Sequence, residues 1–374
     1  MRRPLVIAWK ELIQLRRDRL TLAMVVALPV MQIILFGYAI NTDVRHIPMV
    51  VFDQDASADS RDLVATLLAT RSYDRAGDAR SYAEIERALR GGRARVALVV
   101  PPRFSSDVRR GRSARVQLIV DGSDPQTVAS AIDAAAGVVA DRAASLGVER
   151  LARAGQPAVA PAVVLQPTTW YNPELRTAIF VVPGLTGVIL TMTMIMLTAM
   201  GIARERERGT LEQLVVSPVG RVELMIGKIV PYVGIGYLQM TLILVIGRLA
   251  FGAPIVGSVG LLYLLSLLFI AANLALGLFF STLARTQQQA MQMSFFFLLP
   301  NILLSGFMFP FEGMPRPAQW LSQALPLTHF LRIVRGIALK GAGLPDLLGE
   351  TGALAVIFVV LVAVASARFR KKVG

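Results

Sequence analysis

The stretch RERERGTLEQLVVSP, residues 204–218, decides how the chain is organised. It places three arginines and three glutamates between two segments, 178–203 and 229–247, that are apolar enough to cross a bilayer. Charged side chains are costly inside a bilayer. The stretch must therefore lie in water, on one face of a membrane.

The same stretch predicts a short helix. Thr210 and Gln213 have the spacing of a capping box, and Pro218 would end the helix they open. Its apolar face would consist of Leu211, Leu214 and Val215. A short amphipathic helix held between two spans is well placed to press on a soluble partner, and an ordinary charged loop is the alternative.

The composition indicates an integral membrane protein. Of the 374 residues, 54% are hydrophobic and only 17% are charged, whereas soluble domains average about 25% charged residues. The chain has no cysteine, which excludes disulfides and thiol-based metal or catalytic sites. Its net charge of +14 is spread along the sequence, so we expect contact with anionic lipid headgroups and no nucleic-acid partner.

Six segments approach the ~20 apolar residues that a membrane-spanning helix needs. The first, 20–40, is too long for the core of a signal peptide, so we expect a retained anchor. The predicted spans are 20–40, 178–203, 229–247, 259–284, 291–311 and 352–367. The predicted fold is an α-helical integral membrane protein with six transmembrane helices.

Basic residues predict the orientation. Lys and Arg are concentrated in residues 1–19, in the 204–221 loop and after residue 367, which places both termini and the loop in the cytoplasm. One loop opposes this assignment, because it would carry four cations to the outer face: Arg316, Arg332, Arg335 and Lys340.

With this orientation, residues 41–177 form an inserted small α/β extracytoplasmic domain. Alternating apolar residues predict strands over 47–52, 96–100 and 116–120 and helices over 59–69 and 81–89. Asp124 as N-cap and Pro125 at the first helical position predict a long Ala-rich helix that ends near residue 153. The Pro-rich stretch 156–173 would return to the membrane as an extended strand or linker.

Residues 178–374 would form a five-helix transmembrane domain. Within it, 312–346 is too broken by proline to span a bilayer and too apolar for free solution, so we expect interfacial or re-entrant helices there. His46 and His329 have no carboxylate at ligand spacing, which predicts two plain interfacial residues.

Chemical motifs are scarce. No G-x-x-x-x-G-K-[ST] loop occurs, and no catalytic or metal-binding constellation is evident. No Asp, Glu, Lys or Arg lies near the middle of a predicted span, which argues against an ion-coupled carrier. Polar and sulfur side chains that could line a substrate path, or could simply pack helices, are Thr186, Thr193, Met196 and Asn301.

Five short motifs, taken in order, resemble the ABC-2 type permeases, the membrane subunits of bacterial ATP-binding-cassette exporters. The resemblance is closest to the branch with a large external domain after the first span. The motifs are VFDQD at 51–55, WYNPE at 170–174, VPG at 182–184, RERGTLE at 206–212 followed by SP at 217–218, and PLTHF at 326–330 through RG at 335–336.

The resemblance implies a non-enzymatic half-transporter in the bacterial inner membrane that moves drugs, lipids or other amphipathic substrates. Residues 1–19 look like a cytoplasmic amphipathic elbow helix, and 204–218 looks like the coupling helix. Two permease copies would work with a separate ATPase subunit, which would bind ATP and Mg, so this chain would hold no cofactor. The residues implied in ATPase coupling are Arg204, Glu205, Glu207, Gly209, Thr210, Leu211, Glu212, Leu214 and Ser217.

Other classes of protein share parts of this pattern. A membrane-anchored envelope-assembly or signalling protein could carry a similar external domain, and so could a four-span mechanotransmitting permease. Six spans with short cytoplasmic loops argue against both. An ion-coupled secondary carrier is a further alternative, disfavoured by the lack of charge within the spans.

Overall fold

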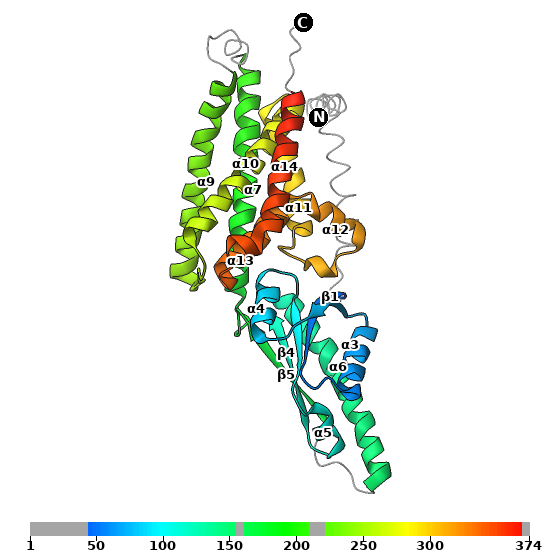
Figure 1. Cartoon of the computed structure of the whole chain (residues 1–374). Coiled ribbons are helices and arrows are strands. Elements are labelled where there is room, and N and C mark those ends of the chain that lie inside the picture. Colours follow the sequence, from blue (N-terminus) through cyan, green and yellow to red (C-terminus); the bar gives the residue numbers. More distant parts are fainter. Residues whose placement is uncertain (1–43, 155–160, 210–220, 369–374) are drawn as a thin grey trace, which may run out of the picture.

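The structure, a computed structural model, describes residues 44–154, 161–209 and 221–368. These residues form a sheet domain and a helical bundle joined end to end (Figure 1). The predicted elbow helix, the predicted first span and residues 210–217 of the predicted coupling helix lie outside the described residues.

The sheet domain contains five strands in the order β2-β1-β3-β4-β5. Strand β1 pairs in parallel with both β2 and β3, β3 pairs antiparallel with β4, and β4 pairs in parallel with β5. The strands are β1 (Ile47–Asp53), β2 (Tyr73–Asp78), β3 (Val96–Val100), β4 (Ala114–Asp121) and β5 (Val163–Trp170).

Helices cover both faces of this sheet because apolar residues alternate along its strands. Ile47, Met49 and Val51 of β1 face a core shared with three helices, and Val50 faces a second core that α4 covers. The helices are α3 (Ala58–Ala69), α4 (Tyr82–Arg90), α5 (Phe104–Arg109) and α6 (Pro125–Ala154), and α4 lies on the face opposite α3, α5 and α6.

Most predicted elements of this domain are confirmed. The predicted start of the long helix is correct: Pro125 is its first residue, and the Asp124 side chain accepts hydrogen bonds from the Gln126 backbone N–H and the Thr127 hydroxyl. The predicted return strand is β5. Strand β2 and helix α5 were not predicted, because β2 buries only Tyr73 and α5 is a single short helix after a left-handed residue, Arg103.

The bundle contains four helices that are long and apolar enough to cross a membrane, counted over the described residues. They correspond to predicted spans two, three, four and six. The helices of the bundle are α7 (Thr177–Glu207), α9 (Arg221–Phe251), α10 (Val259–Leu283), α11 (Gln287–Leu304), α12 (Arg316–Gln323), α13 (Pro326–Lys340) and α14 (Leu348–Arg368), with short 3-10 turns η1 (Phe311–Gly313) and η2 (Leu344–Leu347).

The predicted fifth span has the wrong bounds. Helix α11 begins at Gln287, ends at Leu304 and contains Pro300, whereas the predicted span was 291–311. It ends early because Gly306 has a left-handed φ of +83°, which is typical of the residue that follows a helix end. Six spans therefore stay a prediction.

Helices α12 and α13 differ sharply in burial. Helix α13 packs against α7, α10 and α14, and thirteen of its residues are buried. Its Phe330 ring stacks on Phe269 of α10 with centroids 4.0 Å apart. Helix α12 instead leaves Trp320 73% exposed and Leu321 60% exposed.

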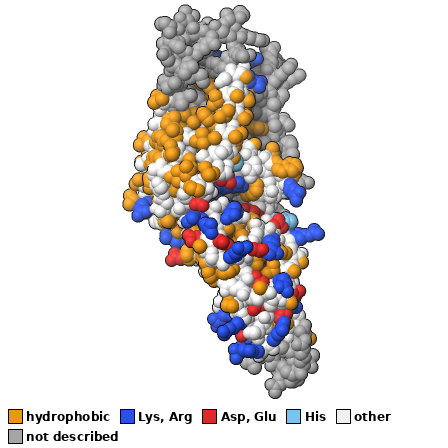
Figure 2. All heavy atoms as spheres, viewed as in Figure 1, with side chains coloured by type: hydrophobic (Ala, Val, Ile, Leu, Met, Phe, Trp, Pro, Cys, Tyr) orange, Lys and Arg blue, Asp and Glu red, His pale blue; other side chains and the backbone are white. Residues whose placement is uncertain are grey.

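The ends of the bundle have different neighbours (Figure 1). The last turns of α7 and α14 lie at one end, and the sheet domain lies at the other. Figure 2 shows apolar side chains over the bundle and a belt of acidic and basic side chains where the bundle meets the sheet domain. This distribution matches a bundle embedded in lipid with the sheet domain in water.

Candidate functional site

The end of the bundle remote from the sheet domain carries a small polar cluster. We call Arg204, Glu207 and Gln287 the α7–α11 cluster. Arg204 Nε donates to Gln287 Oε1 at 3.1 Å, and Gln287 Nε2 donates to Glu207 Oε2 at 2.6 Å. The Gln287 backbone N–H also donates to Glu207 Oε1 at 2.9 Å, so a carboxylate of α7 caps the start of α11.

Arg206 extends this connection to α10. Its Nη1 donates to the carbonyls of Ser281 and Ala284 at 2.9 and 2.6 Å. Carbonyls at a helix end lack partners within the helix and attract a cation. The last turn of α7 is therefore tied both to the end of α10 and to the start of α11.

The predicted coupling segment follows this turn directly. Gly209 has a left-handed φ of +67° and lies just after the end of α7. Glu205 is partly exposed on the last turn of α7. The remaining predicted coupling residues, Thr210, Leu211, Glu212, Leu214 and Ser217, lie outside the described residues.

The four predicted path residues differ in exposure. Thr186 is fully buried and donates to the Val182 carbonyl, and Asn301 is 1% exposed with neither amide atom hydrogen-bonded to a described residue. Thr193 accepts from Gln239 Nε2 at 3.3 Å and is partly exposed, as is Met196. Of the four, only Thr193 and Met196 are open to a substrate or partner within the described part of the chain.

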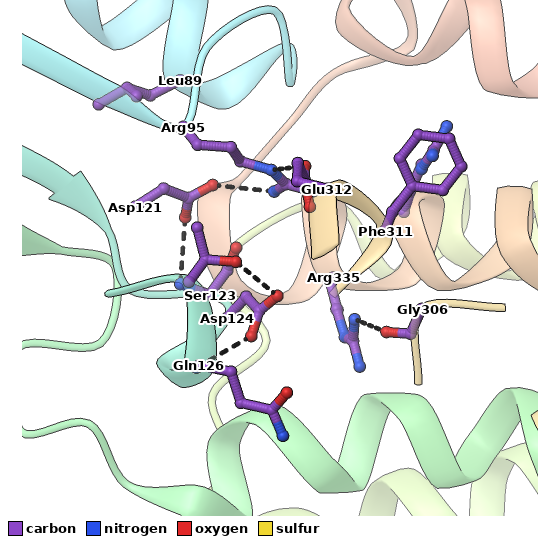
Figure 3. A network of polar contacts seen from close by, with 12 residues as sticks. Leu89, Arg95, Asp121, Ser123, Asp124, Gln126, Gly306, Phe311, Glu312 and Arg335 are labelled. Atoms are coloured by element: carbon purple, nitrogen blue, oxygen red, sulfur yellow. Dashed lines mark hydrogen bonds and ion pairs between the residues drawn. The ribbon is translucent and has the colours of Figure 1, made fainter. Parts of the chain in front are cut away.

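A second polar cluster joins the sheet domain to the bundle (Figure 3). We call Arg95, Asp121 and Glu312, which Figure 3 labels, together with Lys340 the junction network. Arg95 Nη1 contacts Asp121 Oδ2 at 3.2 Å, and Arg95 Nε contacts Glu312 Oε1 at 3.0 Å. Lys340 Nζ pairs with Asp121 Oδ2 and donates to the Leu89 carbonyl at 3.0 Å.

The Lys340–Asp121 pair of the junction network is almost closed to water. The side chains of Asp121 and Lys340 are 0% and 5% exposed. Burial alone would raise the pKa of Asp121, but the charges of Lys340 and Arg95 outweigh it and hold that pKa below its ordinary value. The pKa of Glu312 is lowered in the same way, mainly by Arg95 against burial. Both carboxyls are therefore ionised partners of buried cations.

The prediction that His329 is a plain interfacial residue was wrong. His329 Nδ1 lies 2.6 Å from Glu350 Oε2, its Nε2 lies 2.9 Å from the Gln323 carbonyl, and its side chain is 3% exposed. His46 Nδ1 contacts Asp74 Oδ1 at 3.0 Å. Both carboxylate partners are more than twenty residues away in sequence, so local spacing gave no sign of them.

Contacts within the protein account for three of the four cations that opposed the predicted orientation. Lys340 pairs with Asp121, and Arg332 Nη1 contacts Glu350 Oε1 at 3.0 Å. Arg335 stacks over the Phe180 ring at 4.0 Å and donates to the Gly306 carbonyl at 3.0 Å. These cations serve contacts within the protein. Their excess in this loop is a sequence signal that these cations have partners inside the protein, Lys340 in the junction network among them.

Together, the four long apolar helices and the sheet domain define a polytopic membrane protein with a folded domain in water. The match to a family model described as "ABC-2 family transporter protein" covers residues 19–367. The chain therefore belongs to the ABC-2 transporter family, whose permeases work with ABC ATPase subunits.

Three curated permeases are similar in sequence to this chain over most of their length. The chain is 33% identical to the probable multidrug ABC transporter permease YbhR of Escherichia coli K12 over 97% of each chain. It is 30% identical to the probable multidrug ABC transporter permease YbhS of the same strain, over 91% of this chain and 89% of that protein. It is also 31% identical to the inner membrane transport permease YhhJ of that strain, over 78% and 77% of the two chains.

Proposed function

We propose that this chain is one half of a dimeric exporter that is driven by ATP hydrolysed on a separate subunit. The substrate would be drug-like, lipid or otherwise amphipathic, taken from the cytoplasm or the inner membrane. Both termini and residues 204–218 would face the cytoplasm, and the sheet domain would face outward. The sequence offers no phosphate-binding loop, which supports an ATPase site on another chain.

The α7–α11 cluster is the observation that carries this proposal. The segment that would contact the ATPase subunit leaves α7 at Gly209, two residues after Glu207. Through Gln287 and Arg206, any displacement of that turn reaches α10 and α11 as well as α7. A push on one short helix would thus move three helices of the bundle, which is what conversion of ATPase motion into transport requires.

A double substitution tests the coupling role. Leu211→Asp with Leu214→Asp removes the apolar face of the predicted coupling helix without touching a predicted span. We expect loss of ATPase docking, measured by co-purification, and loss of transport in proteoliposomes, with normal membrane insertion. If the double variant still recruits the ATPase subunit and transports normally, residues 204–218 are only a charged loop.

Two further measurements test the energy source and the dimer. Transport driven by an ion gradient without an ATPase subunit would contradict the proposal, as would ATPase activity of the purified chain alone. Thr193 is partly exposed on α7, so a Thr193→Cys variant should crosslink to a second permease copy if the substrate path lies between two copies. Labelling of that cysteine only by lipid-dissolved reagents would place α7 on the perimeter and exclude this path.

A further inference from the structure

A cavity of about 650 Å³ lies between the sheet domain and the α11–α14 part of the bundle. Ligand pockets usually have volumes of about 300–1,000 Å³, so the cavity has room for a ligand of moderate size. Its walls include three members of the junction network. The residues that give the cavity its binding chemistry are Asp124, Ser305, Gly306, Glu312, Gln319 and Arg335.

Arg335 lines the cavity and has a buried hydrogen-bonding edge that no described residue uses. Its Nη1 donates to the Gly306 carbonyl, but Nε and Nη2 have no hydrogen-bond partner among the described residues. These two nitrogens form one side of the guanidinium, the side that binds two oxygens of a carboxylate or phosphate at once. Gly184 of α7 lies beside this edge, since a Cβ at that position would lie 3.3 Å from Nη2 and 2.5 Å from the Phe307 ring.

Two acids face the same cavity. Glu312 Oε2 is buried and has no hydrogen-bond partner among the described residues, although Oε1 is held by Arg95. Asp124 is 7% exposed and makes no ion pair within 4.0 Å among those residues. Burial raises the pKa of Asp124 and lowers that of Arg335 to about 10, and the opposite charge of each residue offsets only part of the effect of burial on the other.

The charges around the cavity are nearly balanced. The lining residues include six Arg and Lys residues and five Asp and Glu residues, so neither a simple anion nor a simple cation is favoured. A ligand that carries both charges would satisfy Arg335 with its acidic group and the two acids with its basic group. Arg335, on α13, and Asp124, at the start of α6, both line the cavity, and Figure 3 shows how the two side chains lie.

The position of α12 indicates where such a ligand comes from. Gln319 and Gln323 of α12 line the cavity, while Trp320 and Leu321 of the same helix are largely exposed. Exposed tryptophan on a membrane protein is typical of the membrane–water interface. A lipid in that leaflet could therefore place its headgroup in the cavity while its acyl chains stay in the bilayer.

We propose that this cavity binds a zwitterionic phospholipid headgroup, with the phosphate on Arg335 and a primary ammonium group between Asp124 and Glu312. Phosphoethanolamine has this chemistry. Arg335 supplies two parallel N–H donors to the phosphate, and the two acids accept hydrogen bonds from the ammonium group. The site lies within one chain and requires neither ATP nor a second copy.

The test uses the full chain, delipidated in detergent, and counts bound lipid by native mass spectrometry. Phosphatidylethanolamine should bind at least tenfold more tightly than phosphatidylglycerol, which lacks the ammonium group, or phosphatidylcholine, whose ammonium group has no N–H donor. Arg335→Gln and Asp124→Asn should each weaken phosphatidylethanolamine binding about tenfold. Asparagine is as good an N-cap as aspartate, so Asp124→Asn should keep the start of α6 intact.

Arg248→Gln is the matched control. Arg248 is exposed near the end of α9 and does not line the cavity. It should leave lipid binding unchanged. Equal binding of the three lipids, or unchanged binding by Asp124→Asn, would overturn the proposal.

Free phosphoethanolamine separates a lipid site from a site for a soluble ligand. It should compete with phosphatidylethanolamine but bind more weakly, because it lacks the acyl chains. Binding of free phosphoethanolamine with no measurable binding of the lipid would show that the ligand comes from solution, which would overturn the lipid assignment.

Discussion

Lys340 of α13 and Asp121 of β4 are 219 residues apart in sequence and form an ion pair that is almost closed to water. The pair joins the helix buried at the end of the bundle to the last residue of a central strand. Arg95 contacts the same carboxylate oxygen and continues to Glu312. The sheet domain and α13 are therefore held together by buried charge.

Removal of one partner of this pair should be costly. Lys340→Met leaves Asp121 buried with only Arg95 to balance it, and loss of one partner of a buried pair costs about 3–5 kcal/mol. We expect a correspondingly lower melting temperature for the purified protein in detergent. Arg109→Met is the control, because Arg109 and Asp59 form an exposed pair worth at most about 1 kcal/mol. Equal melting temperatures for the two variants would show that Lys340 contributes little.

Gln287 should matter for transport but not for ATPase docking. Gln287→Ala removes the side-chain contacts of the α7–α11 cluster with both Arg204 and Glu207. Changes within a coupling network typically alter coupling by about 0.5–2 kcal/mol, so transport should fall by about tenfold while the ATPase subunit still co-purifies. Gln288→Ala, on the exposed side of the same turn, should transport normally. Full transport by Gln287→Ala would exclude the cluster from coupling.

Gly277 sets the spacing of α7 and α10. A Cβ at this position would lie 2.6 Å from the Ile195 carbonyl oxygen and 2.9 Å from Thr198 Cβ. Gly277→Ala should therefore push the two helices apart and cost about 1–3 kcal/mol. Gly234→Ala is the control, since no described atom outside its own turn lies within 4 Å of the position that a Cβ would take, and alanine favours helix. Thermal unfolding in detergent distinguishes the two, and an unchanged melting temperature for Gly277→Ala would mean that the helices adjust freely.

Asp124 should make stability depend on pH. Because burial raises its folded-state pKa above the unfolded value, the folded protein binds a proton more tightly than the unfolded chain does. The contribution of Asp124 to the free energy of unfolding is therefore most favourable below the pKa that this residue has in the unfolded chain. That contribution is lost as pH rises through the pKa that it has in the folded protein. Asp124→Asn should therefore raise the melting temperature at pH 7, and the gain should shrink as pH falls toward about 4, the ordinary pKa of an aspartate. A loss of stability at pH 7 would show that the ionised carboxylate is favoured there.

The orientation can be tested by cysteine labelling, because the chain has no cysteine of its own. Arg110 and Arg208 are exposed and belong to the sheet domain and to the end of α7. In intact inner-membrane spheroplasts, an impermeant maleimide should label Arg110→Cys, and it should label Arg208→Cys only after the membrane is permeabilised. The reverse pattern would invert the proposed topology.

Much of the sheet domain and four long helices could be predicted from the sequence, because their signals are local. Alternating apolar residues predict β1, β3 and β4, and the Asp124-Pro125 pair predicts the start of α6. Strand β2 was missed because it is an edge strand with one buried side chain. The end of α11 was misplaced because apolar residues continue past Leu304, and the turn at Gly306 depends on a backbone angle.

The junction network could not be predicted in the same way. Arg95 and Glu312 are 217 residues apart, and no periodic pattern links strands to a helix so distant. Only the surplus of Arg and Lys in a loop assigned to the outer face hinted that these cations have partners inside the protein.

The long helix α6 converts a small tilt of the sheet domain into a larger displacement at its far end. It starts at Pro125, beside Asp124 at the wall of the cavity, and its 30 residues extend about 45 Å at 1.5 Å per residue. A tilt of the sheet domain by about 5° at its base would swing the far tip sideways by about 4 Å, roughly the Cα spacing of adjacent residues. A small shift of a bundle helix that tilts the sheet domain would therefore displace the far end of α6 by several ångströms. Distance measurements from a spin label near that end of α6 could resolve this displacement.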